Sequence, residues 1–184
     1  GQYTADTSRL HAVLDCEDAE SGIAYYECAA GTAPGGTDVA AWTACGPGPD
    51  VQLGGLQLRS GVTYYISARA VNGAGLRGPE GCSDGIKLDT TPPVVSIVGD
   101  DGQFTGTADR LSGSWSADDP ESGIAGYRYC IGTAPGLDDV AGWMHAGTAT
   151  QHTRENLSLE NGQTYYITVV ATNGAGGESA PASS

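Results

Sequence analysis

The sequence contains a single methionine, a single phenylalanine and no stretch of leucine, lysine, glutamate and alanine at helical spacing. Glycine, proline and tyrosine are instead abundant, with 29, 9 and 9 residues. Short runs that alternate apolar and polar side chains between glycine- and proline-containing turns are typical of β-strands. We therefore expect an all-β protein with almost no helix.

Basic side chains are also scarce, because 8 Lys and Arg stand against 22 Asp and Glu, for a formal net charge of −14. Such a surface repels the phosphates of nucleic acids and anionic membrane surfaces. No apolar run is long enough to span a membrane, and the start lacks the pattern of a signal peptide. We expect no nucleic-acid partner and no membrane span in this segment, with any export signal removed or upstream.

The chain repeats itself, without a gap, at an offset of 101 residues. Residues 1–83 align with residues 102–184, and 35 of these 83 pairs are identical. Matching runs begin at Glu20 and Glu121, and at Thr63 and Thr164. Because this period is the size of a small domain, the chain is predicted to hold two domains in tandem.

The stretch 84–101 occurs only once, and its two strand-like runs flank Thr90-Thr-Pro-Pro93. Adjacent prolines favour a stiff, extended backbone, as in a domain linker. We place the domains at 1–90, without a first strand, and 91–184, without a last strand. Two interpretations stay open: the chain is an excerpt of a longer array, or neighbouring copies complete it head to tail and build a filament.

Trp115 lies in the second strand of the second repeat, where the first repeat has Leu14, and a leucine precedes Tyr64 and Tyr165 by six residues. In these residues the chain resembles the fibronectin type III domain, an immunoglobulin-like β-sandwich. The resemblance implies two tandem fibronectin III-like sandwiches. It also implies that Tyr64 and Tyr165 form tyrosine corners, whose hydroxyl groups bond to nearby backbone. The sequence lacks the Arg-Gly-Asp motif of integrin-binding members.

The first repeat holds four of the five cysteines: Cys16, Cys28, Cys45 and Cys82. Without Cys-x-x-Cys spacing, four cysteines in a small β domain favour two disulfides over a zinc site, and an oxidising, extracellular setting. Placed on the fibronectin III-like scaffold, they are expected to pair as Cys16–Cys82 and Cys28–Cys45. Cys130 aligns with Ala29 and is expected to face outward, as a free surface thiol or in an intermolecular bridge.

Carboxylates recur at matching positions of the two repeats, at Asp18 and Glu20 and at Asp119 and Glu121. Calcium takes several oxygen ligands of this kind, although the spacing matches no EF-hand loop. Asp or Ser before Gly also caps turns through bonds to its own backbone. Both interpretations stay open, and calcium is the one cofactor that the sequence suggests.

Other residues are candidates for contacts at the surface. Asn156 begins an N-glycosylation sequon, Asn-Leu-Ser. Tyr65 and Tyr166, together with Trp42 and Trp143 on a short edge strand, either form a surface that contacts carbohydrate or protein, or pack over the rim of the core.

Catalysis is not expected. The three histidines, His11, His145 and His152, align with Ser, Ala and Val in the other repeat, and no pattern brings a nucleophile, base and orienting group together.

The sequence favours non-catalytic extracellular or cell-surface repeats that act as spacers or structural units of a surface protein, stalk or filament. Their partners would be neighbouring repeats. The alternatives are an adhesin or receptor module that binds protein or glycan, and accessory domains of a secreted polysaccharide-active enzyme.

Overall fold

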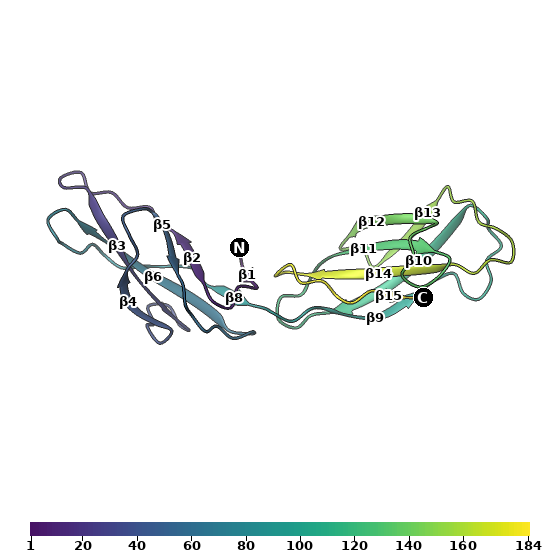
Figure 1. Cartoon of the computed structure of the whole chain (residues 1–184), viewed down its shortest axis with the longest axis horizontal. Coiled ribbons are helices and arrows are strands. Elements are labelled where there is room, and N and C mark those ends of the chain that lie inside the picture. The colour runs from purple at the N-terminus through teal and green to yellow at the C-terminus, as the bar shows by residue number, and fades with distance from the viewer. The chain divides into compact units, whose positions relative to one another are not determined.

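A computed structural model describes the backbone of residues 1–184 and every side chain except that of Ile97. Every element in it is a strand, which confirms the all-β class. The chain forms two compact units, Gly1–Thr90 and Thr91–Ser184. Each unit has its own sheets (Figure 1).

The first unit contains these strands: β1 (Tyr3–Thr4), β2 (Leu10–Val13), β3 (Ile23–Gly31), β4 (Ala40–Ala44), β5 (Asp50–Leu53), β6 (Thr63–Asn72), β7 (Gly81–Cys82) and β8 (Ile86–Leu88). The larger sheet has the order β1-β8-β6-β3-β4, and β7 also pairs with β6. Strands β2 and β5 form the smaller sheet. Strand β1 runs parallel to β8, whereas the other pairs are antiparallel.

The second unit contains these strands: β9 (Val94–Gly99), β10 (Arg110–Asp118), β11 (Ile124–Gly132), β12 (Ala141–Gly147), β13 (Gln151–Glu155), β14 (Tyr166–Asn173) and β15 (Ala182–Ser183). One sheet has the order β13-β10-β9 and the other has the order β12-β11-β14-β15. All of these pairs are antiparallel. The alternating positions of both sheets share one core, as in a sandwich.

The core of the second unit is built around Trp115 of β10, which is 3% exposed. Its ring centroid lies 6.1 Å from that of Tyr127 and 5.4 Å from that of Tyr129. The indole N–H donates to the carbonyl of Ala149 at 3.0 Å. Aromatic rings bury large areas, so this cluster supplies much of the stabilisation of the unit.

The core of the first unit has smaller side chains at the aligned positions. Leu14 replaces Trp115 and Cys28 replaces Tyr129, whereas Val51 is a core residue at the position of the exposed His152. Cys28 and Val51 are fully buried, and Leu14 packs against the same cluster. This unit therefore has less aromatic area with which to stabilise its sandwich.

Both tyrosine-corner residues bond to the backbone five residues before them. Tyr64 Oη accepts a hydrogen bond from the N–H of Arg59 at 2.7 Å, and Tyr165 Oη accepts one from the N–H of Glu160 at 2.6 Å. These bonds hold the chain where it enters β6 and β14, as in other β-sandwiches.

The two units differ at the edges where the aligned sequence is incomplete. Strand β10 has nine residues and pairs with both β13 and β9, whereas its counterpart β2 has four residues and pairs with β5. Strand β6 likewise begins at Thr63 beside β8, whereas β14 begins at Tyr166. Strand β2 is therefore shorter than β10 because, in the described chain, it lacks a partner that corresponds to β9. Strand β14 is shorter than β6 because it lacks, among the described residues, a partner that corresponds to β8.

Candidate functional site

The acidic turn of the first unit is tied to the end of β6 by an Asp–Asn clasp, formed by Asp18, Ser21 and Asn72. Asp18 accepts hydrogen bonds from the backbone N–H of Ser21 at 2.7 Å and from Asn72 Nδ2 at 2.9 Å. The bond from Asn72 is the largest cause of the lowered pKa of Asp18. Asn72 Oδ1 in turn accepts from the N–H groups of Ala74 and Leu76.

The second unit repeats the Asp–Asn clasp with Asp119, Ser122 and Asn173. Asp119 accepts from the N–H of Ser122 at 2.9 Å and from Asn173 Nδ2 at 3.0 Å. Here the clasp is buried, with Asp119 6% and Asn173 1% exposed. Asn173 Nδ2 also donates to the carbonyl of Thr91, so the clasp holds the start of this unit.

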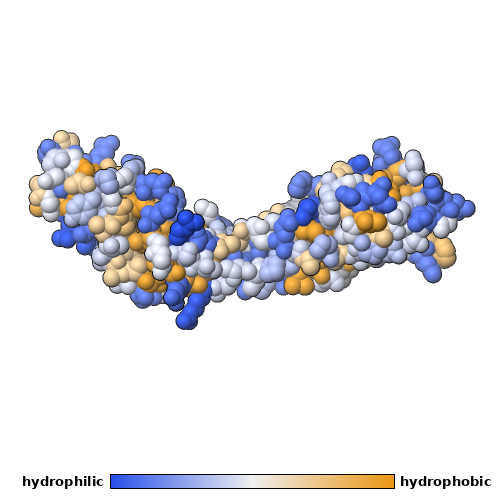
Figure 2. All heavy atoms as spheres, viewed as in Figure 1, coloured by the Kyte–Doolittle hydropathy of each residue, from blue (hydrophilic) through white to orange (hydrophobic). Residues whose placement is uncertain are grey.

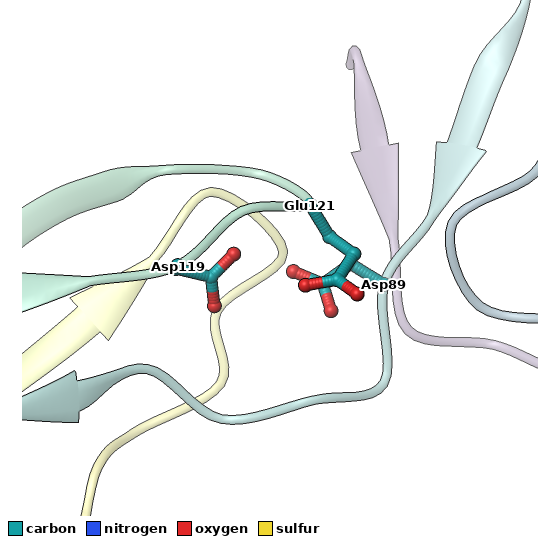
Figure 3. A group of neighbouring side chains, drawn as sticks. All are labelled: Asp89, Asp119 and Glu121. Carbon is teal, nitrogen blue, oxygen red and sulfur yellow. The ribbon is translucent and has the colours of Figure 1, made fainter.

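The four residues suggested for calcium lie in these two turns. Asp119 and Glu121 each offer one carboxylate oxygen within 4.8 Å of the other (Figure 3). Glu121 accepts a hydrogen bond from Thr91 Oγ1 at 3.1 Å. Glu20 is exposed in the turn that Asp18 caps. Asp18 and Asp119 therefore have a structural role in the turns, and calcium binding stays a prediction.

Cys28 and Cys45 lie next to each other, as the expected pairing requires. Cys28 on β3 is buried, and burial together with contact with Cys45 raises its pKa to about 12. Cys45 follows β4, and its N–H donates to the carbonyl of Tyr26 on β3 at 2.8 Å. Both cysteines are free thiols in this structure.

Cys16 and Cys82 are exposed on separate elements and are also free thiols. Cys16 lies in the irregular segment after β2, near enough to the Tyr26 hydroxyl to raise its pKa, although burial is the larger cause. Cys82 lies on β7, opposite Ser67 of β6. The pairing of Cys16 with Cys82 stays a prediction.

The surface exposure expected for Cys130 is wrong, because its side chain is fully buried although it faces away from the core of the sandwich. The turn after β11 folds back over this face of the strand. Cys130 Sγ donates to the carbonyl of Leu137 at 3.4 Å, and the N–H of Gly136 donates to Thr168 Oγ1 on the adjacent β14 at 2.9 Å. Burial raises the pKa of the Cys130 thiol and removes it from the surface that an intermolecular bridge requires.

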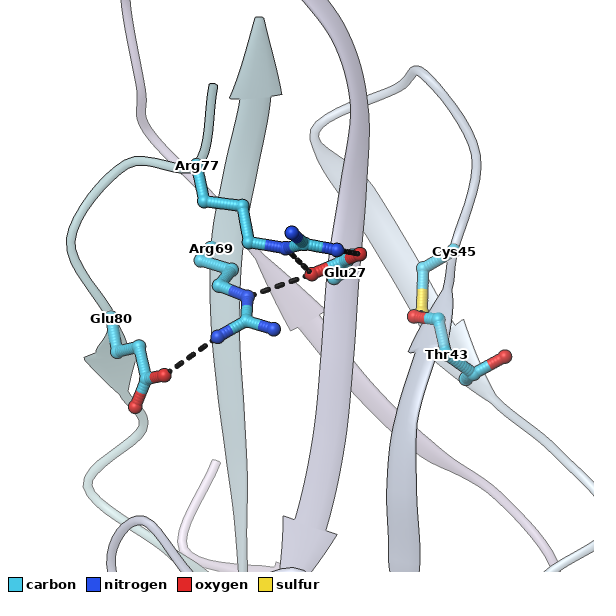
Figure 4. A network of polar contacts seen from close by, with 6 residues as sticks. All are labelled: Glu27, Thr43, Cys45, Arg69, Arg77 and Glu80. Carbon is cyan, nitrogen blue, oxygen red and sulfur yellow. Dashed lines mark hydrogen bonds and ion pairs between the residues drawn. The ribbon is translucent and has the colours of Figure 1, made fainter. Parts of the chain in front are cut away.

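A charged network covers the outer face of the larger sheet of the first unit (Figure 4). Glu27 accepts from Arg69 at 2.7 Å and from Arg77 at 2.9 Å, and Arg69 also donates to Glu80 at 2.8 Å. The bonds from Arg77 and then Arg69 lower the pKa of Glu27 to about 2. The Arg69 guanidinium also lies 4.2 Å from the ring centroid of Trp42, a cation–π contact.

The second unit keeps one pair of this network with its charges exchanged, whereas Val170 and Pro181 replace Arg69 and Glu80. Arg128 occupies the position of Glu27, and Glu178 occupies the position of Arg77. Arg128 donates to Glu178 at 2.8 Å, and its guanidinium lies 4.7 Å from the ring centroid of Trp143. Sequence reasoning missed this network. The sequence contains a signal for it, because Glu27 aligns with Arg128 and Arg77 aligns with Glu178, so the charge changes sign at both positions.

The other candidate residues lie apart from these clusters. Asn156 is exposed just after β13, in the left-handed region with φ of 60°. Tyr65 and Tyr166 are half-buried on β6 and at the start of β14. Glycosylation of Asn156 and a contact surface at these tyrosines stay predictions.

The histidines are distributed over different elements. His11 bonds Asp50 at 2.8 Å, whereas His152 bonds Tyr129 at 2.8 Å in the other unit, and His145 is exposed on β12.

Among the described residues, no helix is long and apolar enough to cross a membrane.

Comparison with known proteins places the fold. No protein-family model and no curated protein matches the sequence. Among solved structures, the crystal structure of the FN1–FN3 domains of chicken CNTN1 is similar, with a TM-score of 0.61 and 16% sequence identity. The match covers 98% of this chain and 60% of the length of that structure. The chain therefore has the fold of tandem fibronectin III-like repeats.

Proposed function

We propose that the chain is a non-catalytic pair of structural repeats that spaces other parts of an extracellular or cell-surface protein. The observation that carries this proposal is that the polar groups shared by both units are bonded within the fold. The Asp–Asn clasps and the tyrosine corners recur at aligned positions. Trp42 and Trp143 also align, although the arginines over their rings come from different positions of the repeat. The features that both repeats share therefore stabilise the fold, as expected of domains that act as spacers of fixed length.

A glycan-binding role for the shared tryptophans has less support. Sugars stack on open aromatic faces, but the rings of Trp42 and Trp143 each carry a guanidinium group. Charged pairs anchor both arginines, because Arg69 bonds Glu27 and Arg128 bonds Glu178. Extracellular placement is supported by the adjacent Cys28 and Cys45, since disulfides persist in oxidising compartments.

Pulling on single molecules from both ends tests the proposal. A spacer of two sandwiches should resist force and unfold in two separate events, each releasing on the order of 300 Å of chain. A Cys28–Cys45 disulfide would shorten one of the two releases by about 60 Å, and a reducing agent would restore it. Unfolding without measurable resistance would contradict a mechanical spacer, and so would specific retention of the chain on a glycan array.

A further inference from the structure

One edge of the first unit lacks a strand that the second unit has. In the second unit, residues 114–118 of β10 pair with Val94–Gly99 of β9. The aligned residues of the first unit are 13–17, where Val13 ends β2 and residues 14–17 are irregular. In the described part of this unit, β2 pairs with β5 alone. Val13 is 72% exposed as a result.

The backbone along this edge is oriented to pair with another strand. The N–H of Leu14 donates to the carbonyl of Pro49 on the β5 side, just as the N–H of Trp115 donates to the carbonyl of Thr150. Successive N–H groups of a strand point to opposite sides, so the N–H of Val13 points away from β5. On the same side of the second unit, the N–H of Ser112 donates to Asp101 Oδ2 at 2.8 Å. Ser112 aligns with His11.

A groove of about 560 Å³ lies beside this edge. Its walls include Leu10 and Ala12 of β2, Ile66 of β6 and Ile86 of β8. In the second unit, the aligned Leu111 and Ile167 belong to the core against which Val95 and Val98 of β9 pack.

We propose that this groove and the edge of β2 accept a strand from the junction of a neighbouring repeat in the same polypeptide. The strand runs antiparallel to β2 in the register of β9, with two inward valines in the groove. The source of the strand rests on the proposed tandem array, whereas the groove belongs to the first unit alone. A second copy of residues 1–184 is a poorer source, because its own segment of this pattern, β9, is already paired with β10.

The other end of the repeat has the complementary arrangement. In the first unit, β8 lies between β1 and the start of β6, where Lys87 is opposite both Tyr3 and Thr63. In the second unit, Phe104 aligns with Tyr3 and is 86% exposed. The junction at residues 84–101 thus supplies β8 to the unit before it and β9 to the unit after it. The junction of a neighbouring repeat would supply the strand that pairs with β2 in the same way.

The test joins a second copy of residues 90–101 directly before Gly1 of the whole chain, because Asp101 precedes Gly102, the counterpart of Gly1. Pairing should slow amide hydrogen exchange at His11, Val13 and Asp15 by on the order of tenfold or more. It should also raise the melting temperature of the first unit, while the protein stays monomeric.

A matched control carries Val95→Asp and Val98→Asp in the added copy only, which leaves β9 of the second unit unchanged. The control should restore rapid exchange at the three amides. Equal exchange in the original chain, the extended chain and the control would overturn the proposal, as would protection that appears only in a dimer. Failure of the spacer function would instead be seen in the pulling experiment and would leave the protected amides unchanged.

Discussion

Asn173 shows how one side chain holds three segments of a unit together. Its amide nitrogen donates to Asp119 and to the carbonyl of Thr91, and its oxygen accepts from the N–H groups of Ala175 and Gly177. Because the residue is buried, water cannot replace these partners when the side chain is removed. The clasp therefore has more effect on stability than an exposed hydrogen bond of the same length.

Replacing Asn173 by Ala should lower the free energy of unfolding by about 1–3 kcal/mol, because it leaves the buried Asp119 carboxylate short of a donor. Chemical denaturation of the purified chain measures the change. The control is Asn161→Ala at an exposed turn position, where a change within about 0.5 kcal/mol is expected.

Thermal melting with and without calcium separates the clasp from a calcium site. If Asp18 and Asp119 serve the turns, calcium and a chelator leave the melting temperature of the original chain unchanged. A calcium-dependent rise in melting temperature that Glu121→Gln abolishes would contradict a purely structural role for these carboxylates.

Glu27 predicts a loss of stability in acid. Its pKa is about 2 in the folded protein, against an ordinary value of 4.5, because Arg77 and Arg69 favour the charged form. A lowered folded-state pKa contributes stability above pH 4.5, and that contribution is lost as the pH falls from 4.5 to about 2. Glu27→Gln should therefore be less stable than the original chain at pH 7, and the difference should shrink by pH 3. An equal difference at both pH values would refute this account.

At the scale of elements, the hairpins after β3 and β11 depend on a close approach of backbone. A Cβ atom on Gly31 would lie 2.5 Å from the carbonyl carbon of Gly36, and one on Gly132 would overlap the carbonyl of Leu137. Aspartates brace both hairpins, since Asp38 bonds Thr32 and Asp139 bonds Thr133. These hairpins explain why Gly-Thr-Ala-Pro-Gly occurs unchanged in both repeats.

Gly132→Ala should destabilise the second unit by about 1–3 kcal/mol, since backbone has to move to make room for the methyl group. Gly142→Ala on the edge strand β12 is the matched control, because its Cβ would meet no atom within 4 Å. Calorimetry can compare the two variants. Similar melting of both would mean that the hairpin adjusts at little cost.

Strands β3 and β4 should be joined by a Cys28–Cys45 disulfide when the protein is produced under oxidising conditions. Reduction should then cost about 3 kcal/mol of stability, as expected for a loop of this size. The readout is denaturation with and without reducing agent. The effect should persist in Cys16→Ser/Cys82→Ser and vanish in Cys45→Ala. A reduction effect that persists in Cys45→Ala would assign the bond to other cysteines.

Sequence alone predicted the strand elements, because alternation, turns and the 101-residue repeat all depend on local pattern. The tyrosine corners followed from the resemblance, and Tyr64 and Tyr165 make the bonds it implies. The burial of Cys130 was not predicted from the sequence. Alternation along a strand shows which side chains face the core, but it does not show that a hairpin covers the outer face of the sheet. The bonds of Glu27 to Arg69 and Arg77 link residues 42 and 50 positions apart, which only the strand register reveals.

At the scale of the whole molecule, the acidic charge and the repeated sequence both favour units of an in-chain array over self-assembling subunits. The chain has a net charge of −14, and hydrophilic residues are interspersed with hydrophobic ones on the visible face of each unit (Figure 2). Like charges oppose association between copies. An exposed strand edge favours association. At the edge of β2, the unpaired backbone therefore favours association between copies, whereas the acidic surface opposes it.

Sedimentation velocity of the unreduced chain over a wide range of concentrations is the most direct test of the central claim, that these are units of an in-chain array and not self-assembling subunits. The account predicts a single species with the 18.6 kDa mass of one chain at every concentration, because β9 is already paired within its own unit. Growth into longer species as the concentration rises would contradict it and would identify a second copy as the source of the strand beside β2.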